Sequence, residues 1–69
     1  MKAALEADDP LIQFFAYGHL REDLRPVSEP FWILARAIVV LLPRNAERTV
    51  CLRKLLEAKD AAVRAKVYQ

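Results

Sequence analysis

The stretch LLPRNAERTVCLRKLLEAKDAAVRAK (Leu41–Lys66) predicts that this chain folds as a helical hairpin. Pro43 ends the apolar segment that precedes it, and Asn45 is a favourable N-cap for the helix that follows. A connection this short joins antiparallel neighbours. We therefore expect residues 28–42 and 45–67 to form two long antiparallel helices.

The second of these helices has two apolar stripes and one charged face. Cys51, Leu55, Ala58, Ala62 and Ala65 follow a helical spacing, and we expect this seam to face the first helix of the hairpin. A second stripe beside it predicts a second packing partner. This stripe comprises Leu52, Leu56, Val63 and Val67. The remaining face carries Arg48, Arg53, Lys54, Lys59, Arg64 and Lys66, interspersed with Glu57 and Asp60.

The first helix of the hairpin is apolar on nearly every side. Ser28 is its expected N-cap and Pro30 lies in its expected first turn. A helix that is hydrophobic all round is buried all round, which one neighbouring helix cannot achieve, so we expect further copies of the chain to cover it. Its apolar run from Phe31 to Leu42 is shorter than the roughly 20 residues of a membrane-spanning helix.

The N-terminal part predicts a short third helix over residues 10–17. Asp9 is its expected N-cap, Pro10 its first residue and Gly18 a left-handed residue after its end. Residues 1–9 lack strong structural signals, so we expect them to be poorly ordered. The fold class is thus all-α, in a single helical domain over residues 1–69.

Composition favours self-association. Apolar residues make up 55% of the 69 residues, against roughly 45–50% in ordinary domains, and a chain of this size buries only about 60% of the surface that it exposes when unfolded. The formal net charge of +2 is too small for a typical binder of nucleic-acid backbones. The single cysteine, Cys51, allows no internal disulfide and is expected to be a buried packing residue. The sequence begins with no secretory signal, so we expect a cytoplasmic protein.

Residue types argue against catalysis. The chain has one His, one Ser and one Thr, no glycine-rich loop and no nucleophile motif, so we expect no enzyme, no metal site and no cofactor. Arg48 and Thr49 could bind an anion at the start of the last helix, or could belong to a capped helix with solvated arginines. Tyr17 could stack on a nucleobase and His19 could bind a ligand. Residue types alone favour packing of the aromatic cluster onto the hairpin for Tyr17, and a turn or capping role for His19.

The sequence resembles a family of small phage proteins that act as cyclic-nucleotide sponges against the bacterial defence system CBASS. The resemblance covers about residues 11–67 and is strongest in LPRNAERTVCLRKLLEAKDAAVRA, which follows the aromatic cluster FFAYGHL. It implies a homohexamer of helical hairpins that binds cyclic dinucleotides of the cyclic GMP-AMP type and cyclic trinucleotides of the cyclic tri-adenylate type. Such proteins sequester these ligands without cleaving them, which allows the phage to evade immunity.

The resemblance also implies a set of ligand-binding residues. Phe15 and Tyr17 match the aromatic pair of the family motif, while Gly18 separates Tyr17 from the His19 that should follow it. Tyr17 is thereby expected to stack on a base. The other expected ligand contacts are His19, Arg25, Ser28, Arg48, Thr49 and Arg64, with the arginines on phosphate.

Two other classes of function remain open from the sequence. The chain could be a structural or protein-binding oligomerisation module without a small-molecule ligand, in which the arginines form the rim of an interface. It could also be a small nucleic-acid regulator, although the modest net charge disfavours binding to DNA.

Overall fold

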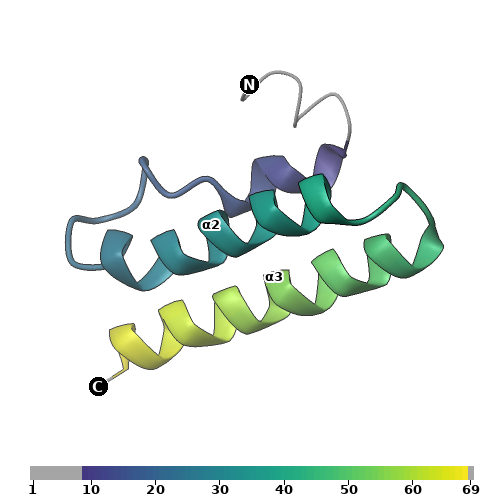
Figure 1. Ribbon diagram of the computed structural model, residues 1–69. Coiled ribbons are helices and arrows are strands. Elements are labelled where there is room, and N and C mark those ends of the chain that lie inside the picture. Colours follow the sequence, from purple (N-terminus) through teal and green to yellow (C-terminus); the bar gives the residue numbers. More distant parts are fainter. Residues whose placement is uncertain (1–8, 69) are drawn as a thin grey trace.

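The hairpin and the helix that packs on it are seen in a computed structural model, which describes residues 9–68. The short 3-10 helix η1 (Pro10–Phe15) is followed by the α-helices α2 (Arg25–Leu41) and α3 (Ala46–Val67). The two long helices are antiparallel neighbours, and η1 lies against both of them (Figure 1). The predicted all-α fold, with a short N-terminal helix and an antiparallel hairpin, is confirmed. The expectation for residues 1–9 falls almost entirely outside the described residues.

The helix η1 begins as predicted but is shorter and more tightly wound. The Asp9 side chain accepts a hydrogen bond from Leu11 N at 3.0 Å, as an N-cap should. Because a 3-10 helix has three residues per turn, Ile12 and Phe15 point the same way, and both are fully buried. The helix ends at Phe15 rather than residue 17, and Gly18 does not have the left-handed conformation that we expected.

The helix α2 starts three residues before the predicted Ser28. Leu24 is its N-cap and provides no side-chain cap; the backbone amides of Val27 and Ser28 both donate to Leu24 O at 3.1 Å. Pro26 therefore takes the first-turn position that we had given to Pro30, and Pro30 lies inside the helix. The prediction failed because either proline fits a first turn, where a missing N–H costs nothing.

The helix α3 starts where the sequence predicted. The Asn45 side chain accepts a hydrogen bond from Arg48 N at 2.9 Å, which confirms the predicted N-cap. Glu47 lies in the first turn and Arg64 and Lys66 in the last turn, each at the end of the helix that favours its charge.

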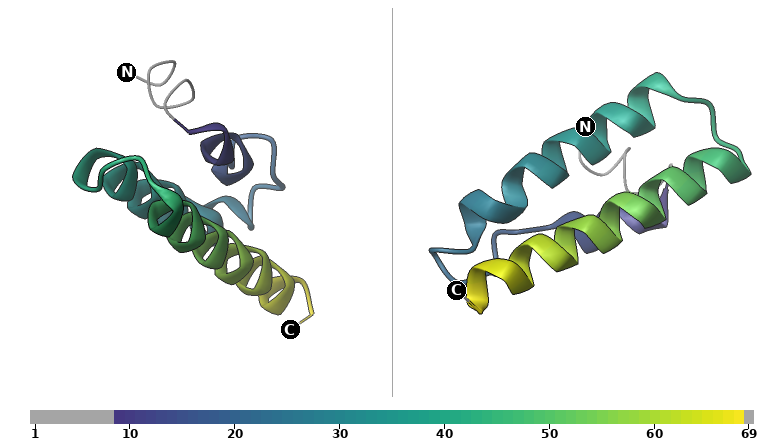
Figure 2. Two further views of the ribbon diagram at one scale, coloured as in Figure 1. Left: turned by 90° about the vertical axis from the view of Figure 1, so that its right-hand side faces the viewer. Right: turned by 90° about the horizontal axis from the view of Figure 1, so that it is seen from below.

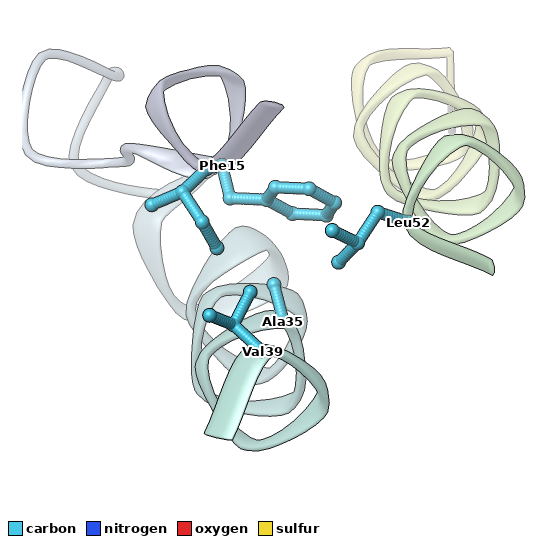
Figure 3. Packing of buried hydrophobic residues seen from close by; sticks show 5 residues of the cluster. Phe15, Ala35, Val39 and Leu52 are labelled. Atoms are coloured by element: carbon cyan, nitrogen blue, oxygen red, sulfur yellow. The ribbon is translucent and has the colours of Figure 1, made fainter. Parts of the chain in front are cut away.

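The core forms where η1 meets the two long helices. Phe15 projects between α2 and α3 towards Ala35, Val39 and Leu52 (Figure 3), and these four side chains are buried together with Ile12. Viewed towards the end of the hairpin, η1 lies to one side of the long helices (Figure 2, left). The buried side of α3 is therefore centred on Leu52.

The seam that we expected to face α2 is displaced. Cys51, Ala58 and Ala65 are exposed, whereas Leu52, from the neighbouring stripe, is fully buried. The side of α3 that carries Leu52 faces η1 and packs with Phe15, so this side is buried in place of the Cys51 seam. The expectation that Cys51 is buried in this core is therefore wrong.

A large apolar surface of α2 is left uncovered in this single chain. Ile33, Val40 and Leu41 are 58%, 71% and 77% exposed. In the described part of the chain, neither long helix has the length and apolar character needed to cross a membrane. The predicted all-round burial of this helix is not achieved within one chain.

Candidate ligand-binding face

Arg48, which the sequence offered as a phosphate ligand, is an internal residue. Its side chain is only 2% exposed, and its Nη2 lies 3.4 Å from Asp9 Oδ2. Its Nη1 donates to the backbone oxygens of Val39 and Leu42, both at 3.3 Å, where α2 ends. The last carbonyls of a helix have no partner within the helix. Arg48 satisfies two of them and ties the segment before η1 to the hairpin.

Thr49 is half-buried at the start of α3, and Ser28 lies inside the protein. Thr49 Oγ1 donates to Asn45 O at 3.4 Å within the first turn of α3. Ser28 is fully buried in α2, and its hydroxyl has no hydrogen-bond partner among the described residues. In this conformation Ser28 offers no surface to a ligand.

Tyr17 lies in the segment between η1 and α2 and is anchored to α2. Its hydroxyl donates a hydrogen bond of 2.9 Å to Glu29 Oε2. This bond, with smaller contributions from desolvation and from the negative charge of Glu29, raises the pKa of Tyr17 above its ordinary value. The backbone of the segment turns immediately afterwards, where Leu20 N donates to Tyr17 O at 3.1 Å. The ring is thus held half-buried beside the first turns of α2.

Arg36 and Trp32 extend the same side of α2. Glu29, Trp32 and Arg36 are spaced three and four residues apart, which places them on one helix face. The Arg36 guanidinium lies 5.7 Å from the centroid of the Trp32 ring, within the range of a cation–π contact. The positive charge of Arg36 also lowers the pKa of Tyr17, but this effect is smaller than the upward effect of Glu29. We call Tyr17, Glu29, Trp32 and Arg36 the Tyr17 face.

His19, in the loop, and Arg25, at the start of α2, lie near this face. Arg25 Nε donates to Leu20 O at 2.9 Å, which fixes the loop onto the helix, and the residue remains exposed. His19 is exposed in the loop. Both are accessible to a ligand that contacts Tyr17.

Arg64 lies at the opposite end of α3 from the hairpin turn. Because the helices are antiparallel, this end lies near the start of α2 (Figure 1). The neighbouring Lys66 acts on the Asp23 carboxyl of the loop, where hydrogen bonds from Arg21 are the main cause of a pKa below the ordinary value. Arg64 is exposed there and can reach a ligand at this end of the molecule.

Apart from the buried Ser28, the other six predicted ligand contacts fall into two groups. Thr49 and Arg64 are fifteen residues apart on one helix, which corresponds to about 22 Å at 1.5 Å per residue. Arg48 and Thr49 lie at the hairpin turn, while Tyr17, His19, Arg25 and Arg64 belong to the other half of the molecule. One small ligand cannot contact both groups within one chain.

The sequence did not single out Glu29, Trp32 and Arg36 as functional residues. Arg36 stood out only as an interruption of an apolar run, and Trp32 as one apolar residue among many. The available signal was their shared face of α2, three and four residues apart. In a helix that is expected to be buried on every side, a shared face does not distinguish functional residues from packing residues.

The Tyr17 face combines two half-buried aromatic rings, of which Trp32 also packs against the core, with an exposed cation and an exposed carboxylate. Rings of this kind stack on planar bases, and a guanidinium binds phosphate through paired hydrogen bonds. Within residues 9–68, no cluster of His, Cys, Asp and Glu side chains could hold a metal ion.

Comparisons of the chain with protein families, with curated proteins and with solved structures found no match.

Proposed function

We propose that this protein assembles with copies of itself and binds a cyclic oligonucleotide, which it sequesters without cleaving it. The observation that carries the proposal is the ring of Tyr17, anchored by Glu29 on the helix face that also carries Trp32 and the guanidinium of Arg36. An anchored ring loses little freedom when a base stacks on it, so its position favours binding. Arg36 supplies a positive charge for a phosphate next to that base.

The uncovered apolar surface of α2 supports self-association. Ile33 and Val40, at 58% and 71% exposed, are seven residues apart and so share one side of α2, and Leu41, at 77% exposed, extends this apolar surface. Burying such side chains stabilises a contact by about 1.5–3 kcal/mol each. A second copy of the chain provides an equally apolar surface, and clefts between copies can enclose a ligand that one chain only touches.

This function agrees with the sponge family that the sequence resembles. In that setting the ligand is a signal of the CBASS defence system, the protein is encoded by a phage, and it acts in the cytoplasm of the infected bacterium. Holding the signal withdraws it from the effector that it would activate. We propose Tyr17, Trp32 and Arg36 as the ligand contacts, with His19, Arg25 and Arg64 at the margin.

Isothermal titration calorimetry against a panel of cyclic di- and trinucleotides tests the proposal. Replacing Tyr17 with Ala should weaken binding at least tenfold, or about 1.4 kcal/mol, because stacking contributes about 1–3 kcal/mol per base. The matched control is Tyr68→Ala, since Tyr68 is 79% exposed at the end of α3.

The same experiment examines the fate of the ligand. After binding, the protein is denatured and the released nucleotide is analysed by mass spectrometry. Recovery of the intact ring is expected of a sponge. Recovery of a linear product would replace the proposal with a phosphodiesterase activity, and an absence of binding to the whole panel would overturn it.

A structural or protein-binding module is the second candidate, and the exposed apolar side of α2 favours it. Light scattering coupled to size-exclusion chromatography separates the two. A homo-oligomer that binds cyclic nucleotides supports the sponge. A monomer that binds no panel member and becomes more ordered only with a protein partner supports the module.

A further inference from the structure

We propose that Glu29 selects guanine, so that the Tyr17 face prefers guanine-containing cyclic oligonucleotides over those that contain only adenine. This inference rests on the proposed function and adds to it the identity of the base. The starting observation is the place of a carboxylate in a site that otherwise suits an anion. Glu29 is exposed, and its Oε2 is fixed 2.9 Å from the Tyr17 hydroxyl.

A carboxylate weakens the binding of phosphates unless another part of the ligand donates hydrogen bonds to it. Like charges repel, and the cost grows when a ligand displaces water from the site. Arg36 offsets part of this repulsion, since it lies close enough to influence the same tyrosine. The carboxylate then needs a donor on the ligand, and in a nucleotide the strong donors belong to the bases and to the ribose hydroxyls.

The position of Glu29 favours the base. Its carboxylate lies at the rim of the Tyr17 ring because it accepts the hydroxyl of that ring. A base stacked on the ring brings its own edge close to this rim. An ionised carboxylate has two oxygens with about four acceptor sites, so the bond from Tyr17 leaves acceptor sites free.

Guanine is the base whose edge matches a carboxylate. Its ring N1–H and its exocyclic N2 amino group are adjacent donors that point the same way, so one carboxylate can accept from both. Adenine presents an acceptor, ring N1, beside its amino donor, and this acceptor faces the carboxylate unfavourably. A site built for hydrogen bonding rejects a ligand that leaves its polar groups unpaired.

The test measures the affinity of the full-length protein for cyclic di-GMP, cyclic di-AMP and cyclic di-IMP. Hypoxanthine, the base of the last, keeps the N1 donor of guanine and lacks the amino group. We expect cyclic di-GMP to bind at least tenfold more tightly than cyclic di-AMP, with cyclic di-IMP between them. Equal affinities for the three ligands would overturn the inference and leave the proposed function standing.

The variant Glu29→Gln separates base selection from the anchoring of Tyr17. Its amide oxygen can still accept the tyrosine hydroxyl, but its amino group now meets the donors of guanine. We expect the preference for cyclic di-GMP over cyclic di-AMP to fall at least tenfold or to reverse. A uniform loss for all three ligands would overturn the inference, because it would mean that Glu29 only positions Tyr17 or contacts ribose.

The matched control is Tyr17→Phe, which keeps the stacking ring and removes the hydroxyl. We expect it to weaken all three ligands by a similar factor and to keep the guanine preference. Loss of the preference in this variant, with affinity for cyclic di-AMP unchanged, would assign base selection to the tyrosine hydroxyl and overturn the role of Glu29. If none of the three ligands binds the unaltered protein, this inference fails, and the proposed function fails with it only when the whole panel of cyclic di- and trinucleotides also gives no binding.

Discussion

Replacing Arg48 with Ala should destabilise the fold rather than weaken ligand binding directly. The guanidinium is held by Asp9 Oδ2 at 3.4 Å and by the carbonyl oxygens of Val39 and Leu42 at 3.3 Å. The substitution leaves the carboxylate of Asp9 buried without its counter-charge, and it leaves two helix-end carbonyls without this donor. Removing one partner of a buried ion pair typically costs about 3–5 kcal/mol.

The distances favour the lower end of this range. All three contacts are longer than the 2.7–2.9 Å of a strong charge-assisted hydrogen bond. We therefore expect a loss of about 3 kcal/mol. A chain of 69 residues has a total stability of roughly 3–10 kcal/mol by the usual 0.05–0.15 kcal/mol per residue. A loss of this size would unfold most of the variant if the total stability lies at the lower end of the range, as the small buried core leads us to expect.

Two further variants connect the loss to the ion pair. Arg48→Lys keeps the charge on a single ammonium group that cannot reach all three oxygens, so its loss of stability should be intermediate. Asp9→Asn removes the negative charge but retains an N-cap side chain for η1. The double variant Arg48→Ala with Asp9→Asn contains no unpaired buried carboxylate, so its loss of stability should be smaller than the sum of the single losses.

Urea unfolding followed by circular dichroism measures these effects. Stability of an assembly depends on protein concentration, so the variants must be compared at one concentration and then at a second. If Arg48→Ala costs less than about 1 kcal/mol and nevertheless abolishes nucleotide binding, Arg48 is a phosphate ligand. The internal role derived from its burial would then be refuted.

Three other predictions concern the aromatic and apolar residues. The pKa of Tyr17 should exceed the ordinary value of about 10 and return towards it in Glu29→Gln, as measured by nuclear magnetic resonance of ring-labelled tyrosine. The folded chain holds the tyrosine proton more tightly than the unfolded chain does. The contribution of this hydroxyl to stability is therefore complete below about pH 10 and is lost as the pH rises through the raised pKa. Phe15→Ala should cost about 3–5 kcal/mol in urea unfolding, since the ring is fully buried, and an unchanged midpoint would exclude it from the core. Val40→Asp should lower the mass measured by light scattering while Arg44→Asp, in the exposed turn, leaves it unchanged; an equal mass for both variants would show that this part of α2 is not the interface.

The fold could be predicted from the sequence wherever one local signal had one interpretation. Asp9 before Pro10 and Asn45 before α3 each gave a cap that the structure confirms. The start of α2 was missed because Pro26 and Pro30 offer the same first-turn signal. Local chemistry could not choose between two prolines, and the packing of the preceding loop decided it.

The candidate site was harder to predict because charge and burial depend on tertiary contacts. Arg48 belongs to a helix face that looks solvated in sequence, yet its partner Asp9 lies 39 residues earlier in the chain. Nothing in the spacing of residues marks that pair. Tyr17 was predicted from its neighbours in the sequence, whereas its anchor Glu29 becomes visible only once the loop has folded back onto α2.

The small core suggests that folding and assembly are coupled in this protein. Within residues 9–68 the cluster of buried apolar side chains has five members, one of them an alanine, with six half-buried apolar residues packed on it, while Ile33, Val40 and Leu41 remain more than half exposed. A chain with so small a core is expected to be only marginally stable alone. Association would bury the apolar side of α2, and the fraction of chains that are assembled would increase with protein concentration. A ligand bound between copies would add to the same stabilisation. The cyclic nucleotide should therefore raise the unfolding midpoint most at protein concentrations where the chain is already assembled, because at lower concentrations part of its binding free energy is used to bring the copies together.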